Sequence, residues 1–219
     1  MAQVKVINYG TYQANSSKYA TFFNSFNCPL MTVTTASSNK CIVSFPDTFK
    51  VTFDLEPASA QSSSYQSILT EYNGSSTKYS GECVISRGLN ILCACSDNFV
   101  YIDHWDGWGN HFEILYSKTA GCRFYSWLDN SNVITSMTLH EIESGLNYTL
   151  GSRLNFSNDS GIISITDAAL FRSGIRSIND SNFLCCTPVT KGVKVLVGDD
   201  VYYSLNTNIL VPYEEVENG

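Results

Sequence analysis

The sequence predicts an all-β protein, and three observations carry that prediction. Hydrophobic residues make up 43% of the 219 residues, enough for a folded core, while only 15% are charged. Short runs rich in β-branched and aromatic residues recur along the whole chain. Gly, Asn, Asp and Ser bound these runs, as they do at turns between strands. Regular short strands with turns between them indicate one sandwich or barrel.

The clearest strand in the first half of the chain is FKVTFDLE, residues 49–56. Its apolar residues Phe49, Val51 and Phe53 alternate with polar ones, which predicts one buried face and one exposed face. A Ser-rich loop follows, and we expect the next strand at QSILTEY, residues 66–72.

The middle and end of the chain continue this series. We expect further strands within residues 83–87, 89–95, 98–105, 111–117, 122–129, 133–142, 147–156 and 161–170. Helix is expected only in TDAALFRSGI, from Thr166, and there at most a single turn. Near the end, VKVLVGDDVYYSL (193–205) predicts a hairpin around Gly198, Asp199 and Asp200.

No internal repeat or interdomain linker interrupts the chain, so we expect one compact domain. Residues 1–40 form an N-terminal arm or first strands in this interpretation, and residues 41–180 form the sandwich. Residues 181–219 supply a C-terminal hairpin and an acidic tail, packed on the same domain.

Charge and composition exclude several classes of partner. The formal net charge of −7, without a Lys/Arg cluster, argues against nucleic acid and anionic membrane surfaces. No apolar run is long enough for a transmembrane helix. The opening residues MAQVKVINYG contain no basic segment followed by an apolar one, so we expect no signal peptide.

The eight cysteines are expected to be mostly reduced, because disulfides belong to oxidising compartments. Neither Cys93-Ala94-Cys95 nor the adjacent Cys185-Cys186 has the spacing of a zinc site. We therefore expect no metal ligands among the cysteines and no cofactor.

A resemblance to a known family covers roughly residues 45–175. Its closing passage carries the most specific residues, which are Leu150-Gly151, Phe156, Gly161-Ile162-Ile163 and Ala169-Leu170. The order of these segments resembles that of laminin G-like, or concanavalin A-like, domains. This resemblance implies an antiparallel two-sheet jelly-roll sandwich, a fold that serves many functions.

The segment YIDHWDGWGNHFEI, residues 101–114, holds the candidate ligand site. In a strand, Tyr101, Asp103 and Trp105 share one face, while Ile102 and His104 point the other way. An indole stacks on the apolar face of a pyranose, and carboxylate and amide groups bind its hydroxyls. The expected ligand-binding residues are therefore Asp103, Trp105, Asp106, Trp108, Asn110 and His111. The alternative is a packed turn, with Trp105 in the core and Trp108 over a sheet edge.

Two other clusters suggest different chemistry. Glu141 and Glu143 share a strand face beside His140 and could serve as the acid and base of a glycoside hydrolase or lyase. The third carboxylate that the resembling laminarinase-type enzymes carry further along the strand is missing. Oxygen-rich turns at 129–132 and 158–159 make calcium an alternative to no cofactor, although Asx-turns explain both.

The favoured interpretation is a non-enzymatic glycan-binding or adhesion module. With no signal peptide and an acidic surface rich in Asn, Ser, Thr and Tyr, the chain resembles a bacteriophage virion protein made in the host cytoplasm. Its partners would be a glycan of a cell surface or mucus, other virion proteins and further copies of itself.

The first alternative is a structural head or tail accessory subunit. The arm at 4–27, with Phe22, Phe23 and Phe26, and the hairpin at 193–205 would then form assembly contacts. A polysaccharide hydrolase or lyase is the second alternative.

Overall fold

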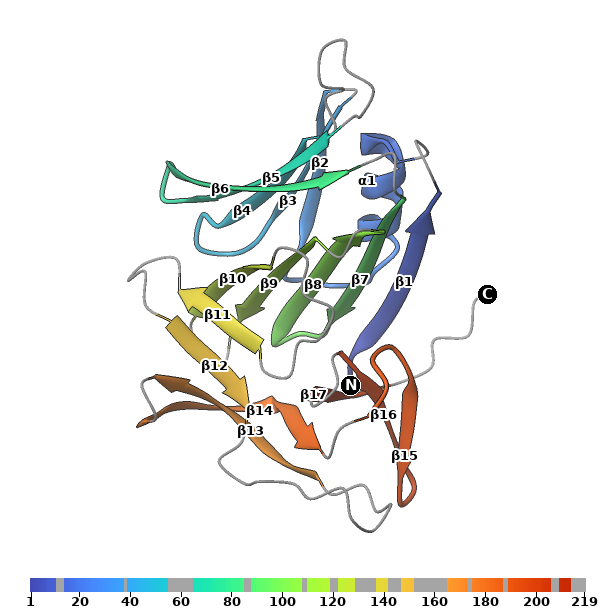
Figure 1. The fold of residues 1–219 in the computed structure, drawn as a ribbon, viewed down its shortest axis with the longest axis vertical. Helices are drawn as coiled ribbons and strands as arrows, with labels where there is room; N and C mark the ends of the chain where they lie inside the picture. Colours follow the sequence, from blue (N-terminus) through green and yellow to red (C-terminus); the bar gives the residue numbers. More distant parts are fainter. Residues whose placement is uncertain are drawn as a thin grey trace.

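The structure is a computed structural model. It describes residues 1–10, 14–37, 39–54, 65–84, 88–107, 110–118, 122–128, 137–141, 147–151, 165–172, 175–186, 189–205 and 209–213. Within these residues the chain forms two antiparallel sheets and one helix, which confirms the all-β prediction (Figure 1).

The larger sheet contains twelve strands. In spatial order they are β1 (Gln3–Tyr9), β7 (Leu89–Cys95), β8 (Phe99–Asp106), β9 (His111–Ser117), β10 (Cys122–Leu128), β11 (Met137–Glu141), β12 (Asn147–Gly151), β13 (Ile165–Arg172), β14 (Ile175–Cys186), β17 (Ile209–Pro212), β16 (Asp200–Ser204) and β15 (Lys194–Val197). From β7 to β14 each strand pairs with the next one in the chain. Short connections and alternating apolar residues favour such local antiparallel pairing.

This sheet curves back so that its first strand meets its C-terminal strands (Figure 1). Ala2 forms an isolated parallel bridge with Tyr213, and its backbone N–H donates to the carbonyl of Pro212 at 2.8 Å. The curved sheet therefore encloses a core of its own between β7–β9 and the strands β13, β14 and β17.

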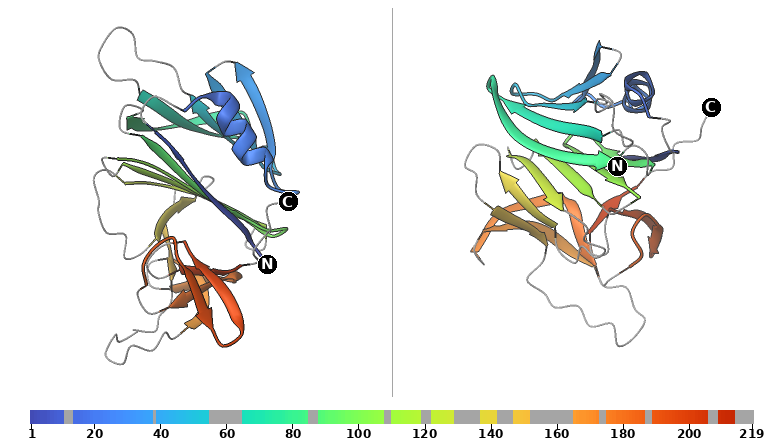
Figure 2. Two further views of the ribbon diagram at one scale, coloured as in Figure 1. Left: turned by 90° about the vertical axis from the view of Figure 1, so that its right-hand side faces the viewer. Right: turned by 45° about the horizontal axis from the view of Figure 1, so that its top comes forward.

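The smaller sheet contains β2 (Thr32–Ser37), β3 (Lys40–Ser44), β4 (Lys50–Asp54), β5 (Tyr65–Tyr72) and β6 (Ser75–Val84), in chain order. Together with α1 (Ser16–Asn24) it covers the other face of β7–β9, as Figure 2 shows. The buried face predicted for this segment is confirmed, because Phe49, Val51 and Phe53 are fully buried in this second core, but Asp54 on the polar face is buried too.

Helix α1 lies in the segment that the sequence assigned to an arm or first strands. Asn15 caps it by accepting the backbone N–H of Lys18 at 2.8 Å. Its aromatic residues Phe22 and Phe23, and Phe26 just beyond it, are buried against the smaller sheet. The idea that these three rings are exposed assembly contacts is therefore wrong, because they form part of the core.

Of two other predictions about secondary structure, one is wrong and one is confirmed. The helical turn expected from Thr166 is wrong, since β13 spans this stretch and pairs with β12 and β14. The C-terminal hairpin is confirmed: Val197 pairs with Asp200 across a tight turn, in which Gly198 has a φ of 63°.

The arrangement confirms antiparallel sheets, and the jelly-roll order stays a prediction. Strand β1, from before residue 40, and strands β15–β17, from after residue 180, belong to the same twelve-stranded sheet as β7–β14.

Candidate functional site

A cavity of about 380 Å³ lies where β1, β7, β8 and β9 meet the C-terminal hairpin. Its lining residues are Val6, Leu92, Trp105, His111, Lys191, Gly192 and Tyr203. We call this cavity the Trp105 pocket. Its volume is in the range of small-molecule sites, and its walls combine apolar side chains and aromatic rings with a few polar groups.

Strand pairing brings two of the predicted site residues to the pocket wall. Trp105 of β8 lies directly opposite His111 of β9, and their rings are parallel within 8° at a centroid distance of 5.9 Å. The ammonium of Lys191 lies 4.8 Å from the centre of the indole. The indole is therefore held by two contacts inside the protein, one of them a cation–π contact.

Asp103, two residues before Trp105 on the same strand face, lies beneath these groups and is fully buried. Its Oδ1 is 3.3 Å from Nδ1 of His111, and its Oδ2 accepts a hydrogen bond from the ammonium of Lys191. Burial raises the pKa of this carboxyl, but the charges and hydrogen bonds of Lys191 and His111 outweigh it and hold the pKa below its ordinary value. Asp103 is thus an ionised anchor that fixes two pocket residues.

A second buried carboxyl lies beside this anchor. Glu113 is the cross-strand partner of Asp103, and its Oε1 accepts a hydrogen bond from the hydroxyl of Tyr101 at 2.8 Å. Burial and the negative charge of Asp103 raise the pKa of Glu113 to about 7. Its Oε2 has no hydrogen-bond partner among the described residues. Glu113 is therefore about half protonated at pH 7 and neutral at lower pH.

Two other predicted site residues, Asp106 and Asn110, do not line the pocket. Asp106 and Asn110 bond to each other across the β8–β9 turn, with Nδ2 of Asn110 donating to Oδ2 of Asp106 at 2.8 Å. The N–H of Asn110 also donates to Oδ1 of Asp106, and both residues are buried. Their geometry is that of a turn closure. Trp108 lies outside the described residues.

Lys191, Gly192 and Tyr203 were not predicted as site residues, and no local pattern marks them. Lys191 is 88 positions from Asp103 in the sequence and reaches it only because the sheet curves round. From the sequence alone, Lys191 is indistinguishable from an ordinary charged surface residue.

The alternative sites lie largely outside the described residues. Glu141 is the last residue of β11 and pairs with Phe124, but its side chain is not described, and Glu143 lies outside the described residues. The turns proposed for calcium, at 129–132 and 158–159, also lie outside them. Among the described residues, no group of three acidic, His or Cys side chains is placed to hold a metal ion.

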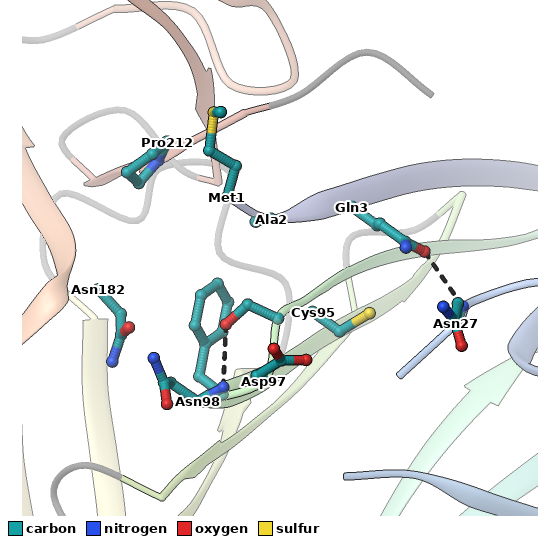
Figure 3. A pocket seen from close by; sticks show the side chains of 11 residues that line it. Met1, Ala2, Gln3, Asn27, Cys95, Asp97, Asn98, Asn182 and Pro212 are labelled. Atoms are coloured by element: carbon teal, nitrogen blue, oxygen red, sulfur yellow. Dashed lines mark hydrogen bonds between the residues drawn. The ribbon is translucent and has the colours of Figure 1, made fainter. Parts of the chain in front are cut away.

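A second cavity, of about 400 Å³, lies at the opposite end of β7 (Figure 3). Most of its polar lining comes from amide side chains. Asn98 and Asn182 face each other across it, and Gln3 accepts the backbone N–H of Asn27 at 3.2 Å. Among the described residues its lining includes Asp97, and the aromatic residue there, Phe99, is buried. This cavity has the weaker resemblance to a sugar site.

No helix in the described part of the chain is both long and apolar enough to cross a membrane. Comparison with known proteins found no matching family model, curated protein or solved structure.

Proposed function

We propose that this protein is a non-enzymatic saccharide-binding module and that the Trp105 pocket is its binding site. The observation that carries the proposal is the combination of aromatic and polar groups in one cavity. Trp105 and Tyr203 supply rings, Val6 and Leu92 supply apolar surface, and Lys191 supplies hydrogen-bond donors. A sugar ring needs the same combination, because it has an apolar C–H face and a polar rim.

The fixed geometry of the pocket supports binding. Asp103 holds Lys191 and His111 from below, so these side chains lose little further freedom when a ligand binds. The jelly-roll topology and a place on a virion surface belong to the same proposal. Packed antiparallel sheets support the jelly-roll topology, and the sequence composition supports the place on a virion surface.

Two adjacent tyrosines of β16 allow a matched test. Tyr203 lines the Trp105 pocket, whereas Tyr202 packs against a separate small cluster that includes Val195 and Leu210. We expect Tyr203→Ala to lose binding on a glycan array while Tyr202→Ala retains it, with circular dichroism confirming that both variants are folded. Equal binding by the two variants, or no glycan retained by the wild type, would contradict the proposal.

A second candidate function, a structural subunit of an assembly, is favoured by the outer hairpin. β15 is the last strand of the larger sheet, and Leu196 on it is 69% exposed. Val193 and Val201 are each 38% exposed nearby. An open strand edge with exposed apolar residues is a surface for strand pairing with a neighbouring protein.

Light scattering after size-exclusion chromatography tests this second candidate. An assembly surface predicts oligomers of the wild type that Leu196→Lys dissociates, with Lys18→Ala on the exposed side of α1 as a control. A monomer at high concentration, with no change in the variant, would oppose self-assembly through this edge.

A further inference from the structure

The polar groups that line the Trp105 pocket are predominantly hydrogen-bond donors. Lys191 presents an ammonium, Trp105 an indole N–H and Tyr203 a hydroxyl that can also accept. No carboxylate or amide side chain lines it within the described part of the chain. The groups expected to accept sugar hydroxyls are engaged elsewhere, Asp103 beneath the pocket and Asp106 with Asn110 in the turn.

We infer that the Trp105 pocket prefers saccharides that carry a carboxylate, such as uronic or sialic acids, over their neutral counterparts. This inference rests on the proposed function and specifies the ligand class of the same site. The carboxylate would bind the ammonium of Lys191, and the C–H face of the sugar would lie against Val6 and Leu92.

The position of Lys191 supports this preference. An ammonium has three N–H donors, and Asp103 is the one hydrogen-bond partner shown for them in the described structure. The side chain is 27% exposed, so the ammonium is reachable from the pocket it lines. A neutral hydroxyl would accept a charge-assisted hydrogen bond from this ammonium, and a ligand carboxylate would add the attraction of a second, opposite charge.

Like the ammonium of Lys191, the imidazole of His111 is held by Asp103 and lines the pocket. Its Nδ1 faces Asp103, which leaves Nε2 as the ring nitrogen for a ligand. The two carboxyl groups nearest to Lys191, those of Asp103 and Glu113, are both buried beneath the pocket surface. Neither is in a position to contact a ligand carboxylate directly, but the ionised Asp103 offsets part of the charge of Lys191.

The test compares acidic and neutral saccharides in matched pairs. The probes are uronic acids against their methyl esters and parent hexoses, and sialylated against desialylated glycans, on one array at low and high salt. We expect acidic members to bind about fivefold more tightly at low salt, which is the change that one partly exposed ion pair supplies. The preference should shrink at high salt, because ions screen a partly exposed charge.

Variants of two lysines test whether Lys191 causes the preference for acidic saccharides. Lys191→Gln should bind acidic and neutral members equally, whereas Lys194→Gln, whose ammonium lies over the ring of Tyr213, should keep the preference. Lys191→Gln leaves the buried carboxylate of Asp103 with His111 as its remaining partner, and this variant can fail to fold. In that case the double variant Asp103→Asn/Lys191→Gln, which carries neither charge, is used for the same comparison.

The outcomes separate this inference from the proposed function. Equal binding of acidic and neutral members by the wild type, lost in Tyr203→Ala, would overturn the inference and leave the saccharide site in place. An acid preference that persists in the folded Lys191 variants would also overturn it. Binding of no saccharide by the wild type would overturn both.

Discussion

Asp103 and Glu113 lie directly opposite each other on β8 and β9, yet the pKa values of their carboxyl groups are shifted in opposite directions. The ion pairs with Lys191 and His111 hold the pKa of Asp103 below its ordinary value. Among the described residues, Glu113 has the hydroxyl of Tyr101 as its hydrogen-bond partner, and burial and the charge of Asp103 raise its pKa to about 7. This division of charge lets two carboxyl groups lie side by side in a core, with Asp103 ionised and Glu113 neutral below about pH 7.

Replacing Glu113 tests this division through the pH dependence of stability. Its pKa in the folded protein is above its ordinary value of 4.5, so the folded state holds the proton more tightly. The stability that Glu113 contributes is therefore full below about pH 4.5 and is lost as pH rises through 7. Relative to the wild type, Glu113→Gln should gain about 2 kcal/mol of unfolding free energy between pH 5.5 and pH 8.

Urea unfolding of both proteins at the two pH values measures this difference. Other titrating groups cancel in the comparison as long as they are unaffected by the substitution. A difference between variant and wild type that is the same at both pH values would show that Glu113 titrates normally.

His104, on the opposite face of β8, is predicted to stay neutral well below neutral pH. Its Nε2 lies 2.7 Å from the hydroxyl of Tyr19, which donates to Oε1 of Gln66 at 3.3 Å. Burial lowers the pKa of His104 to about 4, so charging it favours unfolding and stability is lost as pH falls from about 6.5 toward 4. An NMR titration of the folded protein should give a midpoint near pH 4, and a midpoint near 6.5 would refute the buried assignment.

The ion pair between the buried Asp103 and the partly exposed Lys191 should contribute more to stability than a surface pair. Lys191→Met leaves the Asp103 carboxylate buried without its cation and should cost about 3 kcal/mol of unfolding free energy. Lys50→Met breaks a pair with Glu71 in which both side chains are over 40% exposed, and should cost less than about 1 kcal/mol.

Thermal or urea unfolding of the two lysine variants makes this comparison. The double variant Asp103→Asn/Lys191→Met should recover part of the loss, because it removes the unpaired charge. Equal costs for Lys191 and Lys50 would mean that the Asp103 pair is effectively solvated.

Cys28 should be the most reactive of the six cysteines whose side chains the structure describes as free thiols. A hydrogen bond from the thiol of Cys95 lowers the pKa of Cys28, which is partly exposed. Burial instead raises the pKa of Cys41 to about 12. Brief treatment with iodoacetamide at pH 8, followed by peptide mass spectrometry, should label Cys28 well before Cys41. Faster labelling of Cys41 would contradict the structure around these thiols.

Sequence patterns predicted the local parts of this site and missed the distant ones. Period-two alternation correctly placed Asp103 and Trp105 on one strand face, and strand pairing then brought His111 beside them. The contributions of Lys191 and Tyr203 depend on how the twelve-stranded sheet curves, which no local pattern encodes.

The missed helix has a different cause, because its signal was present in the sequence. Tyr19, Phe22, Phe23 and Phe26 follow the i, i+3, i+4, i+7 spacing of a helix face, and Asn15 is a favourable N-cap. The many aromatic residues suggested a strand or exposed assembly contacts. Their helical spacing is the stronger signal, and it corresponds to the observed helix. At Asp106 and Asn110, composition suggested a ligand site, whereas the two side chains close a turn.

The most direct test of the saccharide site observes the indole N–H of Trp105 by NMR. The protein would be labelled with ¹⁵N, the signal assigned with Trp105→Phe, and the titrant would be the saccharide that the wild type retains most strongly on the array. The account predicts that this signal shifts and saturates together with binding, because Trp105 lines the pocket. Saturable binding that leaves the Trp105 signal unmoved would place the ligand elsewhere and contradict the account.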